Sequence, residues 1–540
     1  MFEPIRQVRA FFNNTAMIEA TLSRKTVWFW WSLLALLILV SRLPTFNEAF
    51  ERDLMTYMVI ADGLLNGRSL YVDLFEFRPP GVFWTYALFA KVFGASPLAI
   101  FMMGLTCAWL TLWACYVAGR NMAGSLGGLL AAAIWTVISG DLLLQANQPN
   151  TEVFINAALA GAFALLVGAT PDRKQIQRFI AIGLLYGLAS LFKQISLAVT
   201  AVTLGTYVLL APWMAEHQEA AQQDFWPVRV RALWQAVWAG LVVLLCWGLV
   251  IGYFQWLGHL SAFKEALVDT GRSYAGDIWG NVWGFFSNPL VYVPKSGNSF
   301  YVPLAWLLTV LAAGYYWRDR NGRLGLWLAY FGSSLITIAL PGKFFPHYFQ
   351  LWLPPLAIGA GCLLGHSLVV QRRLAVGLLL AVLLPLVGLR LYQHTIPVEQ
   401  VPFYKYGQGH GPEAVESQRI GLWIAQHLDP NTSVYQWGAE PGVYFWAGRP
   451  VLAGGPPGFI VSSPYVQRDT ERLFEQLKTL RPGLIIANKG WLPPGHPIVQ
   501  WMAENYRTIS PPPESVERFL FLIHQDLVPK ESAPQESAPQ

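Results

Sequence analysis

Residues 98–119 read LAIFMMGLTCAWLTLWACYVAG, and residues 124–140 read GSLGGLLAAAIWTVISG. Neither stretch contains Asp, Glu, Lys or Arg, and only Arg120-Asn121-Met122-Ala123 separates them. A helix needs about 20 mostly apolar residues to cross the hydrocarbon core of a bilayer. The two runs therefore predict a pair of membrane-spanning helices, and they favour a polytopic α-helical membrane protein as the fold class.

The composition of the whole chain agrees with this class. Its 540 residues are 54% hydrophobic and 13% charged, whereas soluble chains are about 25% charged. This argues against a soluble enzyme, a disordered chain and a collagen-like fibre. The formal net charge of +5 is scattered along the chain, so the basic stripe or patch of a nucleic-acid binder is missing. The four cysteines lie inside apolar runs, which argues against a disulfide framework or a CxxC metal site.

Long apolar runs recur along the chain and predict about eleven spans. They lie near residues 27–44, 98–119, 124–140, 151–168, 178–193, 195–212, 232–255, 300–317, 324–341, 346–366 and 374–393. No small-residue cleavage site follows the first run, so we expect a retained anchor rather than a signal peptide. The run at 81–94 is short and contains Lys91. We expect it to form a helix that lies at the outer interface or re-enters it.

Lys and Arg are concentrated in alternate loops, which predicts a cytoplasmic N-terminus and, with an odd span count, an extracytoplasmic C-terminus. We expect a cytoplasmic segment at 1–26 and a membrane domain at 27–397, with long outer loops at 45–97 and 256–299. Residues 398–529 alternate helices (414–428, 466–480, 497–505) with strands (433–437, 484–487, 519–524), which predicts an extracytoplasmic α/β domain. The repeated Glu-Ser-Ala-Pro-Gln at 531–540 predicts a disordered tail from residue 530 onward.

Charged side chains gather in the loops expected on the outer side, namely Glu51, Asp53, Arg78, Glu152, Lys193, Arg272 and Lys343. Taken singly, each charge is explained by solvation or by snorkelling to lipid headgroups. Lys193 and Lys343, however, lie close to hydrocarbon, where a charge costs about 2.5–3.5 kcal/mol at a helix centre and less near its end. Outer cations suit a lipid phosphate, and a neighbouring carboxylate suits a general base for a hydroxyl. The chain has no P-loop and no GxGxxG on a strand–helix unit, so no nucleotide is indicated.

The order of residues in the first outer loop resembles that of a known family. Glu51-Arg52-Asp53 is followed by Tyr57, Ala61, Gly67, Tyr71 and Asp73, and then by Arg78-Pro79-Pro80 and Phe93-Gly94. The segment Gly342-Lys343-Phe344-Phe345-Pro346-His347-Tyr348 and the helix with Gly183, Gly187 and Lys193 add to the resemblance. These features are similar to those of C-type membrane glycosyltransferases of the protein O-mannosyltransferase and aminoarabinose transferase superfamily, as is the plan of many spans followed by an outer α/β domain.

The resemblance implies an inverting transfer of a hexose or pentose from a polyprenyl-phosphate donor to a hydroxyl of a protein, lipid or glycan. It places this reaction at the outer face of a bacterial inner or plasma membrane. It implies Asp53 as the catalytic acidic residue, with Glu152 where relatives have a second one. Arg78, Lys343 and Tyr348 match the residues of the family that contact the donor phosphate, and Arg272 is a further candidate.

The chain departs from the family pattern at two points. Arg52 separates two acidic residues that are usually adjacent; we favour Asp53 over Glu51 because Asp53 shares one helix face with Tyr57 and Ala61. One extra Phe stands between Lys343 and the following proline. We expect His347 to pack or hydrogen-bond rather than bind metal, because no second His or Cys lies at ligand spacing. No cofactor is expected, since Glu51 and Asp53 alone are too little to indicate a divalent cation.

Three alternatives remain open at this point. A ligase or phosphotransferase with a donor linked to a lipid diphosphate would share the fold and the outer face. A membrane transporter would bind its substrate at the midplane, often through broken helices and inverted repeats, and we find no such repeat. A non-catalytic binding or assembly protein is the third alternative.

Overall fold

The computed structural model describes residues 23–171, 173–215, 225–295, 298–319, 321–454, 464–492, 494–509 and 518–527. Most of the predicted cytoplasmic segment and the repeated C-terminal tail lie outside these residues. The chain divides into two compact units, each discontinuous in sequence. Unit 1 comprises Met1–Glu48, Arg78–Leu260 and Tyr274–Lys405, and unit 2 comprises Ala49–Phe77, Ser261–Ser273 and Tyr406–Gln540.

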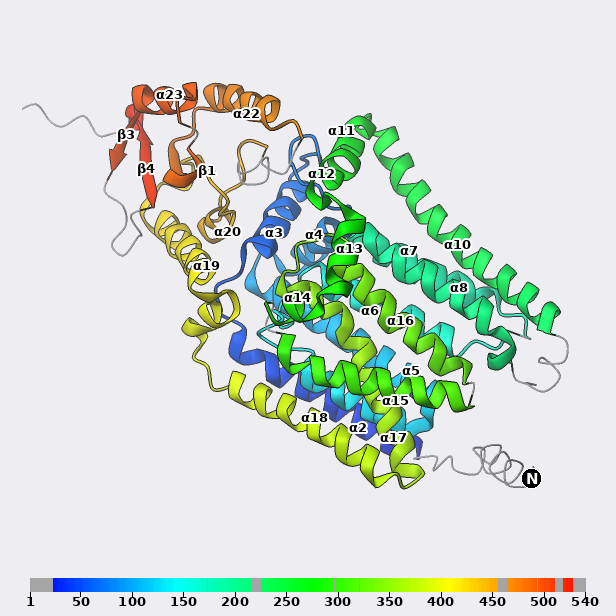
Figure 1. Ribbon diagram of the computed structural model, residues 1–540. Coiled ribbons are helices and arrows are strands. Elements are labelled where there is room, and N and C mark those ends of the chain that lie inside the picture. The colour runs from blue at the N-terminus through cyan, green and yellow to red at the C-terminus, as the bar shows by residue number, and fades with distance from the viewer. Residues whose placement is uncertain are drawn as a thin grey trace, which may run out of the picture. The chain divides into compact units, whose positions relative to one another are not determined.

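Unit 1 is a bundle of long apolar helices (Figure 1). Every predicted apolar run overlaps one of these helices, and the run at 346–366 begins in the 3-10 helix that precedes α17. The helices are α2 (Arg24–Arg42), α5 (Pro97–Ile138), α6 (Thr151–Val167), α7 (Ile176–Phe192), α8 (Leu197–Met214), α10 (Phe225–Trp256), α15 (Val302–Asp319), α16 (Gly322–Ala339), α17 (Leu353–Val369) and α18 (Arg373–Gln393). Within the described ranges, six helical segments are long and apolar enough to cross a membrane, and α4 (Gly81–Phe93), α6 and α7 are shorter apolar helices. The helical membrane class is confirmed, and the number of spans stays a prediction.

Helix α5 contains both of the runs from which the fold class was predicted. Its backbone leaves the helical conformation at Ala123 and at Gly124, where φ is +72°, so the two runs form separate helical arms. Glycine adopts this φ without the strain that a Cβ would cause. The arms pack closely: a Cβ on Gly128 would stand 2.6 Å from the carbonyl oxygen of Tyr116. The first prediction, two helices joined by a short turn, is therefore confirmed.

Unit 2 contains the predicted α/β fold, built on a sheet with the strand order β1-β2-β4-β3. The strands are β1 (Val434–Trp437), β2 (Leu484–Asn488), β3 (Tyr506–Ile509) and β4 (Phe519–His524). Strands β1 and β2 run parallel, and β4 is antiparallel to both β2 and β3. All five residues of β2 are buried, as expected of a central strand covered on both faces.

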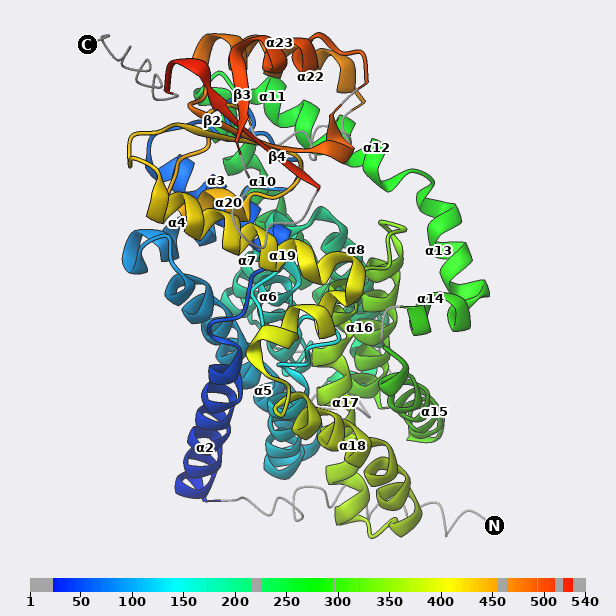
Figure 2. The same ribbon diagram turned by 90° about the vertical axis from the view of Figure 1, so that its left-hand side faces the viewer.

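Helices cover both faces of this sheet. Helices α22 (Val466–Leu480) and α23 (Pro497–Asn505) pack on one face (Figure 2). Their buried residues share a hydrophobic core with Trp437 of β1 and Ile485 of β2. Helices α19 (Val401–His427) and α20 (Gly442–Ala447) pack on the other. The predicted bounds of α22 and α23 are confirmed. Helix α19 begins earlier than expected, while β3 and α20 were not predicted.

The predicted first outer loop is divided between the units after Glu48 and again after Phe77. Helix α3 (Arg52–Leu65) belongs to unit 2, where it packs on α20. Just before α3, the ring of Phe50 stacks on Trp446 with centroids 5.8 Å apart. Just after it, Arg68 donates hydrogen bonds to the carbonyl oxygens of Asp73 (2.8 Å) and Val451. The helix that carries Asp53 is therefore held by the C-terminal fold.

Further short helices lie between α10 and α15. They are α11 (Leu260–Lys264), the π-helical turn Glu265–Thr270, α12 (Gly271–Ala275), α13 (Ile278–Ser287) and α14 (Pro289–Lys295). This is the segment predicted as the second outer loop, and helices α13 and α14 belong to unit 1.

Candidate functional site

One end of unit 1 gathers ionisable side chains from separate elements. We call it the site end; it is where α6 begins, α7 ends and the 3-10 helix η6 (Pro346–Trp352) leads into α17. The side chains described below form what we call the cationic cluster: Arg78, Glu152, Lys193, Tyr274, Lys343, His347 and Tyr348. All seven belong to unit 1.

Glu152 is fixed by the way in which α6 begins. The side chain of Asn150 caps this helix, with its oxygen accepting a hydrogen bond of 2.8 Å from the amide of Thr151. Glu152 lies in the first turn, where the helix dipole favours a carboxylate. Its carboxylate is 1% exposed, accepts a hydrogen bond of 2.9 Å from the Thr151 hydroxyl, and forms an ion pair with Lys193 Nζ.

Lys193 follows directly after α7 and leaves the helical conformation, with φ −149° and ψ 124°. The residue is 8% exposed. Besides its ion pair with Glu152, its Nζ lies 4.1 Å from the ring centroid of Tyr348, a cation–π distance. These contacts explain how the chain tolerates an ammonium group that would otherwise cost several kcal/mol to bury.

Tyr348 joins this buried pair to the more exposed part of the cluster. Its hydroxyl lies 3.4 Å from the hydroxyl of Tyr274. The Nζ of Lys343, an exposed residue, lies 4.7 Å from the ring centroid of Tyr274. The two tyrosines therefore form a bridge with a lysine ammonium at each end.

Arg78 reaches the same end through the segment that leads into α4. Gly81, the first residue of α4, lies against the end of α7: a Cβ there would stand only 2.6 Å from the carbonyl oxygen of Leu191. Only glycine allows this approach, two residues before Lys193. Arg78 is partly exposed, and its positive charge acts electrostatically on Tyr348. The cluster thus combines three cations with one carboxylate.

His347 is buried, and its Nδ1 lies 3.1 Å from the side-chain oxygen of Gln145. Gln145 has a positive φ of 56° and belongs to the buried loop between α5 and α6. The side-chain amide of Gln350 donates to the carbonyl oxygens of Leu144 (2.9 Å) and Gln145 (3.1 Å), which fixes the loop below the cluster. His347 thus has a hydrogen-bond partner in Gln145, and its role in the site stays a prediction.

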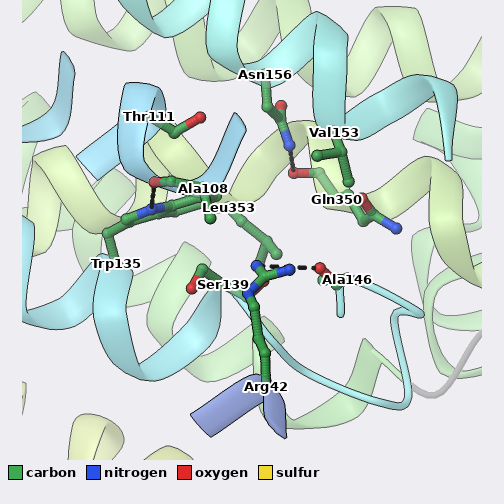
Figure 3. A pocket seen from close by; sticks show the side chains of 10 residues that line it. All are labelled: Arg42, Ala108, Thr111, Trp135, Ser139, Ala146, Val153, Asn156, Gln350 and Leu353. Carbon is green, nitrogen blue, oxygen red and sulfur yellow. Dashed lines mark hydrogen bonds between the residues drawn. The ribbon is translucent and has the colours of Figure 1, made fainter. Parts of the chain in front are cut away.

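The other side of the same loop is held by Arg42, which is 3% exposed. Its guanidinium donates to the carbonyl oxygens of Ser139 (2.8 Å) and Asn147 (3.1 Å). Figure 3 shows Arg42 pointing from α2 toward Ser139 and Ala146, beside a small cavity that Asn156 also lines. Sequence reasoning did not single out Gln145, Gln350 or Arg42. The available signal was a polar residue beside or inside an apolar run.

The remaining predicted site residues belong to unit 2. Asp53 lies in the first turn of α3, and Glu51 is its N-cap residue. Tyr57 and Ala61, which share a face with Asp53, are fully buried. Arg272 lies in α12 and is exposed.

No group of three or more His, Cys, Asp or Glu in the described part of the chain is placed to hold a metal ion. Within the cationic cluster, Glu152 is engaged by Lys193 and His347 by Gln145.

Comparisons with known proteins agree with this fold. Residues 77–222, which include Arg78, Glu152 and Lys193, match the family model of dolichyl-phosphate-mannose-protein mannosyltransferases. Undecaprenyl phosphate-alpha-4-amino-4-deoxy-L-arabinose arabinosyl transferase 2 of Pseudomonas fluorescens is 23% identical over 456 residues, which cover 80% of this chain and 71% of the relative.

Solved structures share the fold at low sequence identity. ArnT from Cupriavidus metallidurans bound to undecaprenyl phosphate matches with a TM-score of 0.57 and 15% identity, over 96% of this chain and 100% of that one. The archaeal oligosaccharyltransferase AglB from Archaeoglobus fulgidus, in complex with an inhibitory peptide and a dolichol-phosphate, matches with a TM-score of 0.53 and 12% identity. That match covers 94% of this chain and 75% of AglB.

The helical bundle, the small C-terminal sheet and these matches define the class of the protein, a membrane glycosyltransferase with the C-type fold. Within that class, the chain is similar to the protein mannosyltransferases, through residues 77–222, and to the aminoarabinose transferases. These matches agree with the resemblance predicted from the order of residues in the first outer loop.

Proposed function

We propose that this protein transfers a sugar from a polyprenyl-phosphate donor to an acceptor hydroxyl at the extracytoplasmic face of the membrane, with inversion at the sugar carbon. The observation that carries the proposal is the grouping of cations at the paired tyrosines Tyr348 and Tyr274 at one end of a membrane bundle. Lys193 lies over the Tyr348 ring, Lys343 lies over the Tyr274 ring, and the charge of Arg78 acts on Tyr348. The lipid phosphates named for the curated and structural relatives support the same class of donor.

The cationic cluster supplies what a departing phosphate needs. When the bond between the sugar carbon and the phosphate oxygen breaks, negative charge grows on that oxygen. Fixed cations and hydroxyl donors in a site of low dielectric stabilise this charge without reorganising. The guanidinium group of Arg78 can donate two parallel hydrogen bonds to a pair of phosphate oxygens, and the ammonium group of Lys343 adds a point charge. Arg272 of unit 2 is proposed as a further phosphate partner.

Asp53 is the proposed general base. In an inverting displacement, the acceptor oxygen attacks the sugar carbon from the face opposite the phosphate. The acceptor proton passes to the Asp53 carboxylate as the new bond forms. Glu51 is the second acidic candidate of the same segment. Helix α3 carries Asp53 in its first turn, and the packing of that helix on α20 gives the carboxylate a rigid support.

The contacts of Glu152 favour a positioning role over that of a second base. Its carboxylate is shared between Lys193 and the Thr151 hydroxyl. It therefore keeps Lys193 charged and fixed beside Tyr348. His347, held by Gln145, adds a second positioning contact next to Tyr348 in η6.

The proposal is tested with the purified protein in lipid nanodiscs and a panel of radiolabelled donors. The panel contains hexoses and pentoses on polyprenyl phosphate, and the same sugars on polyprenyl diphosphate. Release of label from one polyprenyl-phosphate sugar in the presence of membrane and periplasmic extracts identifies both sugar and acceptor fraction. Turnover restricted to diphosphate donors would instead establish the ligase alternative, and turnover with no lipid-linked sugar would overturn the proposal.

Two charge-removing variants then test the cluster itself. Arg78→Met and Lys343→Met are expected to raise the donor KM at least tenfold, because each removes one phosphate contact. Lys91→Met is the matched control. It removes the same charge from an exposed position of α4, about 15 Å along the helix from Gly81. Equal donor KM values in all three variants would exclude Arg78 and Lys343 from phosphate binding.

A further inference from the structure

Helix α13 presents an uncharged aromatic face that no described part of unit 1 covers. Its ten residues, IWGNVWGFFS, include no Asp, Glu, Lys or Arg. Trp279 is 83% exposed, Trp283 76% and Phe286 47%. These positions are four and three residues apart and therefore lie on the same side of the helix.

The opposite side of α13 is fixed to the site end of unit 1. Asn281 donates from its side-chain amide to the carbonyl oxygens of Ala275 (2.9 Å) and Leu340 (3.1 Å). Leu340 caps α16, so α13 lies beside the end of a predicted span, as both views of the ribbon show (Figures 1 and 2). Phe285, the one buried residue of α13, stacks on Phe344 with ring centroids 5.6 Å apart.

This packing reaches the residue next to Lys343. Phe344 has a positive φ of 50°, an uncommon conformation for a residue with a side chain. Its ring is held between Phe285 of α13 and Tyr292 of α14, whose centroid lies 4.5 Å away. A strained backbone of this kind persists only where its surroundings impose it. Helix α13 therefore imposes the conformation of the loop that presents Lys343.

We propose that the exposed face of α13 docks into the boundary between headgroups and acyl chains of the leaflet at the site end, and so fixes the Lys343 loop at the membrane surface. Tryptophan prefers this boundary, where its ring is buried and its N–H remains hydrated. Unit 1 carries further tryptophans with high exposure. Trp256 at the end of α10 is 80% exposed, and Trp306 in α15 is 61% exposed.

Lipid is favoured as the occupant because another predicted span of the same unit also carries exposed apolar residues. In α10, Leu244 and Leu249 are 67% and 66% exposed. A monomer seldom leaves such contiguous surface in water. The effect on Lys343 rests on the proposed function, because that effect concerns a donor that enters from the leaflet. The docking of α13 at the membrane does not depend on the proposed function.

The depth of α13 in the bilayer is measured with nitroxide spin labels in nanodiscs, with the intact protein in a background whose four cysteines are replaced. Labels are attached in Trp279→Cys and Trp283→Cys. Leu249→Cys on α10 is the lipid-facing reference, and Glu475→Cys on α22, 69% exposed at its side chain, is the aqueous reference. Collisions with oxygen and with a soluble nickel chelate report depth.

We expect positions 279 and 283 to collide several-fold more often with oxygen, relative to the nickel chelate, than position 475 does. Collision with nickel as frequent as at position 475 would place α13 in water and overturn the proposal. Protection from both reagents would show that protein covers the face, which would overturn it equally.

A second variant separates docking from donor chemistry. The double variant Trp279→Ser/Trp283→Ser is expected to raise the KM for a long-chain donor in bilayers about tenfold. It should leave the KM for a short-chain, detergent-soluble donor unchanged. Trp226→Ser, 67% exposed at the opposite end of α10, is the matched control. Equal effects on both donors would refute a role in membrane presentation. If no lipid-linked sugar is turned over, the proposed function fails, while the spin-label depths still decide whether α13 docks.

Discussion

The ion pair between Glu152 and Lys193 provides the sharpest test of the cationic cluster. Replacing Glu152 by Gln removes the counter-charge of an ammonium whose side chain is 11% exposed, while the size of the side chain hardly changes. Replacing Lys193 by Met leaves a carboxylate that is 1% exposed without its cation. The double variant removes both charges and leaves two side chains of similar volume in the same space.

The expected magnitudes follow from this burial. Removing one partner of a buried pair costs about 3–5 kcal/mol, because the remaining charge is left uncompensated. Removing both is close to neutral, or stabilising by about 1–4 kcal/mol, because neither charge has to be desolvated. The Tyr348 ring retains part of its attraction for Lys193 in the Gln variant, so Glu152→Gln is expected near the lower end of this range.

Unfolding by denaturant in detergent micelles at pH 7 measures the three variants, and the double-mutant cycle gives the coupling free energy. The exposed pair of Glu475 and Lys478 is the matched control, since a surface pair contributes about 0–1 kcal/mol. We expect the cycle at positions 152 and 193 to show coupling of several kcal/mol and the control cycle almost none. Additive losses at positions 152 and 193 would refute the inference that Glu152 acts through Lys193.

Three further predictions concern other parts of the chain. Asp53→Asn should abolish sugar transfer in the donor assay while binding of polyprenyl phosphate, measured by ligand-dependent thermal stabilisation, is retained; normal turnover would remove Asp53 from the mechanism. Gly81→Ala should raise the donor KM and lower the melting temperature, because its Cβ would meet the Leu191 carbonyl, whereas Gly205→Ala, with open space around it, should do neither. Burial raises the pKa of Asp62, so the stability that this group contributes is full below its unfolded pKa of about 3.9 and is lost as the pH rises through the folded value. Asp62→Asn should therefore raise the melting temperature at pH 7 but not at pH values below about 4; the same increase at both pH values would contradict this assignment.

Much of the fold was predictable because its signals are local. Span-length apolar runs, and the Gly124 break inside α5, need only sequence composition and backbone geometry. The bounds of α22 and α23 follow from periodicity and from the proline that opens α23. Strand β3 was not predicted because it has only four residues, begins directly after α23 and pairs with β4, which comes later in the chain.

The candidate site was predictable only where a charged residue lies next to a long apolar run in the sequence. Lys193 and Glu152 were both noticed, but their pairing across 41 positions has no local signal. Gln145, Gln350 and Arg42 carry ordinary side chains whose role is to saturate the carbonyl groups of a buried loop. A single sequence shows such residues only as polar residues beside or inside apolar runs. It does not show their role, because the partner is backbone and the contact depends on the tertiary fold.

The charge balance of the cationic cluster connects this architecture to the proposed chemistry. Arg78, Lys193 and Lys343 bring three positive charges, and Glu152 forms an ion pair with the most deeply buried of them, Lys193. A sugar linked through a lipid phosphate is a diester with one negative charge, and the departing lipid phosphate gains another as its bond to the sugar breaks. Several cations placed together therefore match the charge that develops during the reaction better than the single charge of the bound donor. Catalysis requires such a difference, since an interaction that is equally strong before and during bond breaking does not accelerate the step.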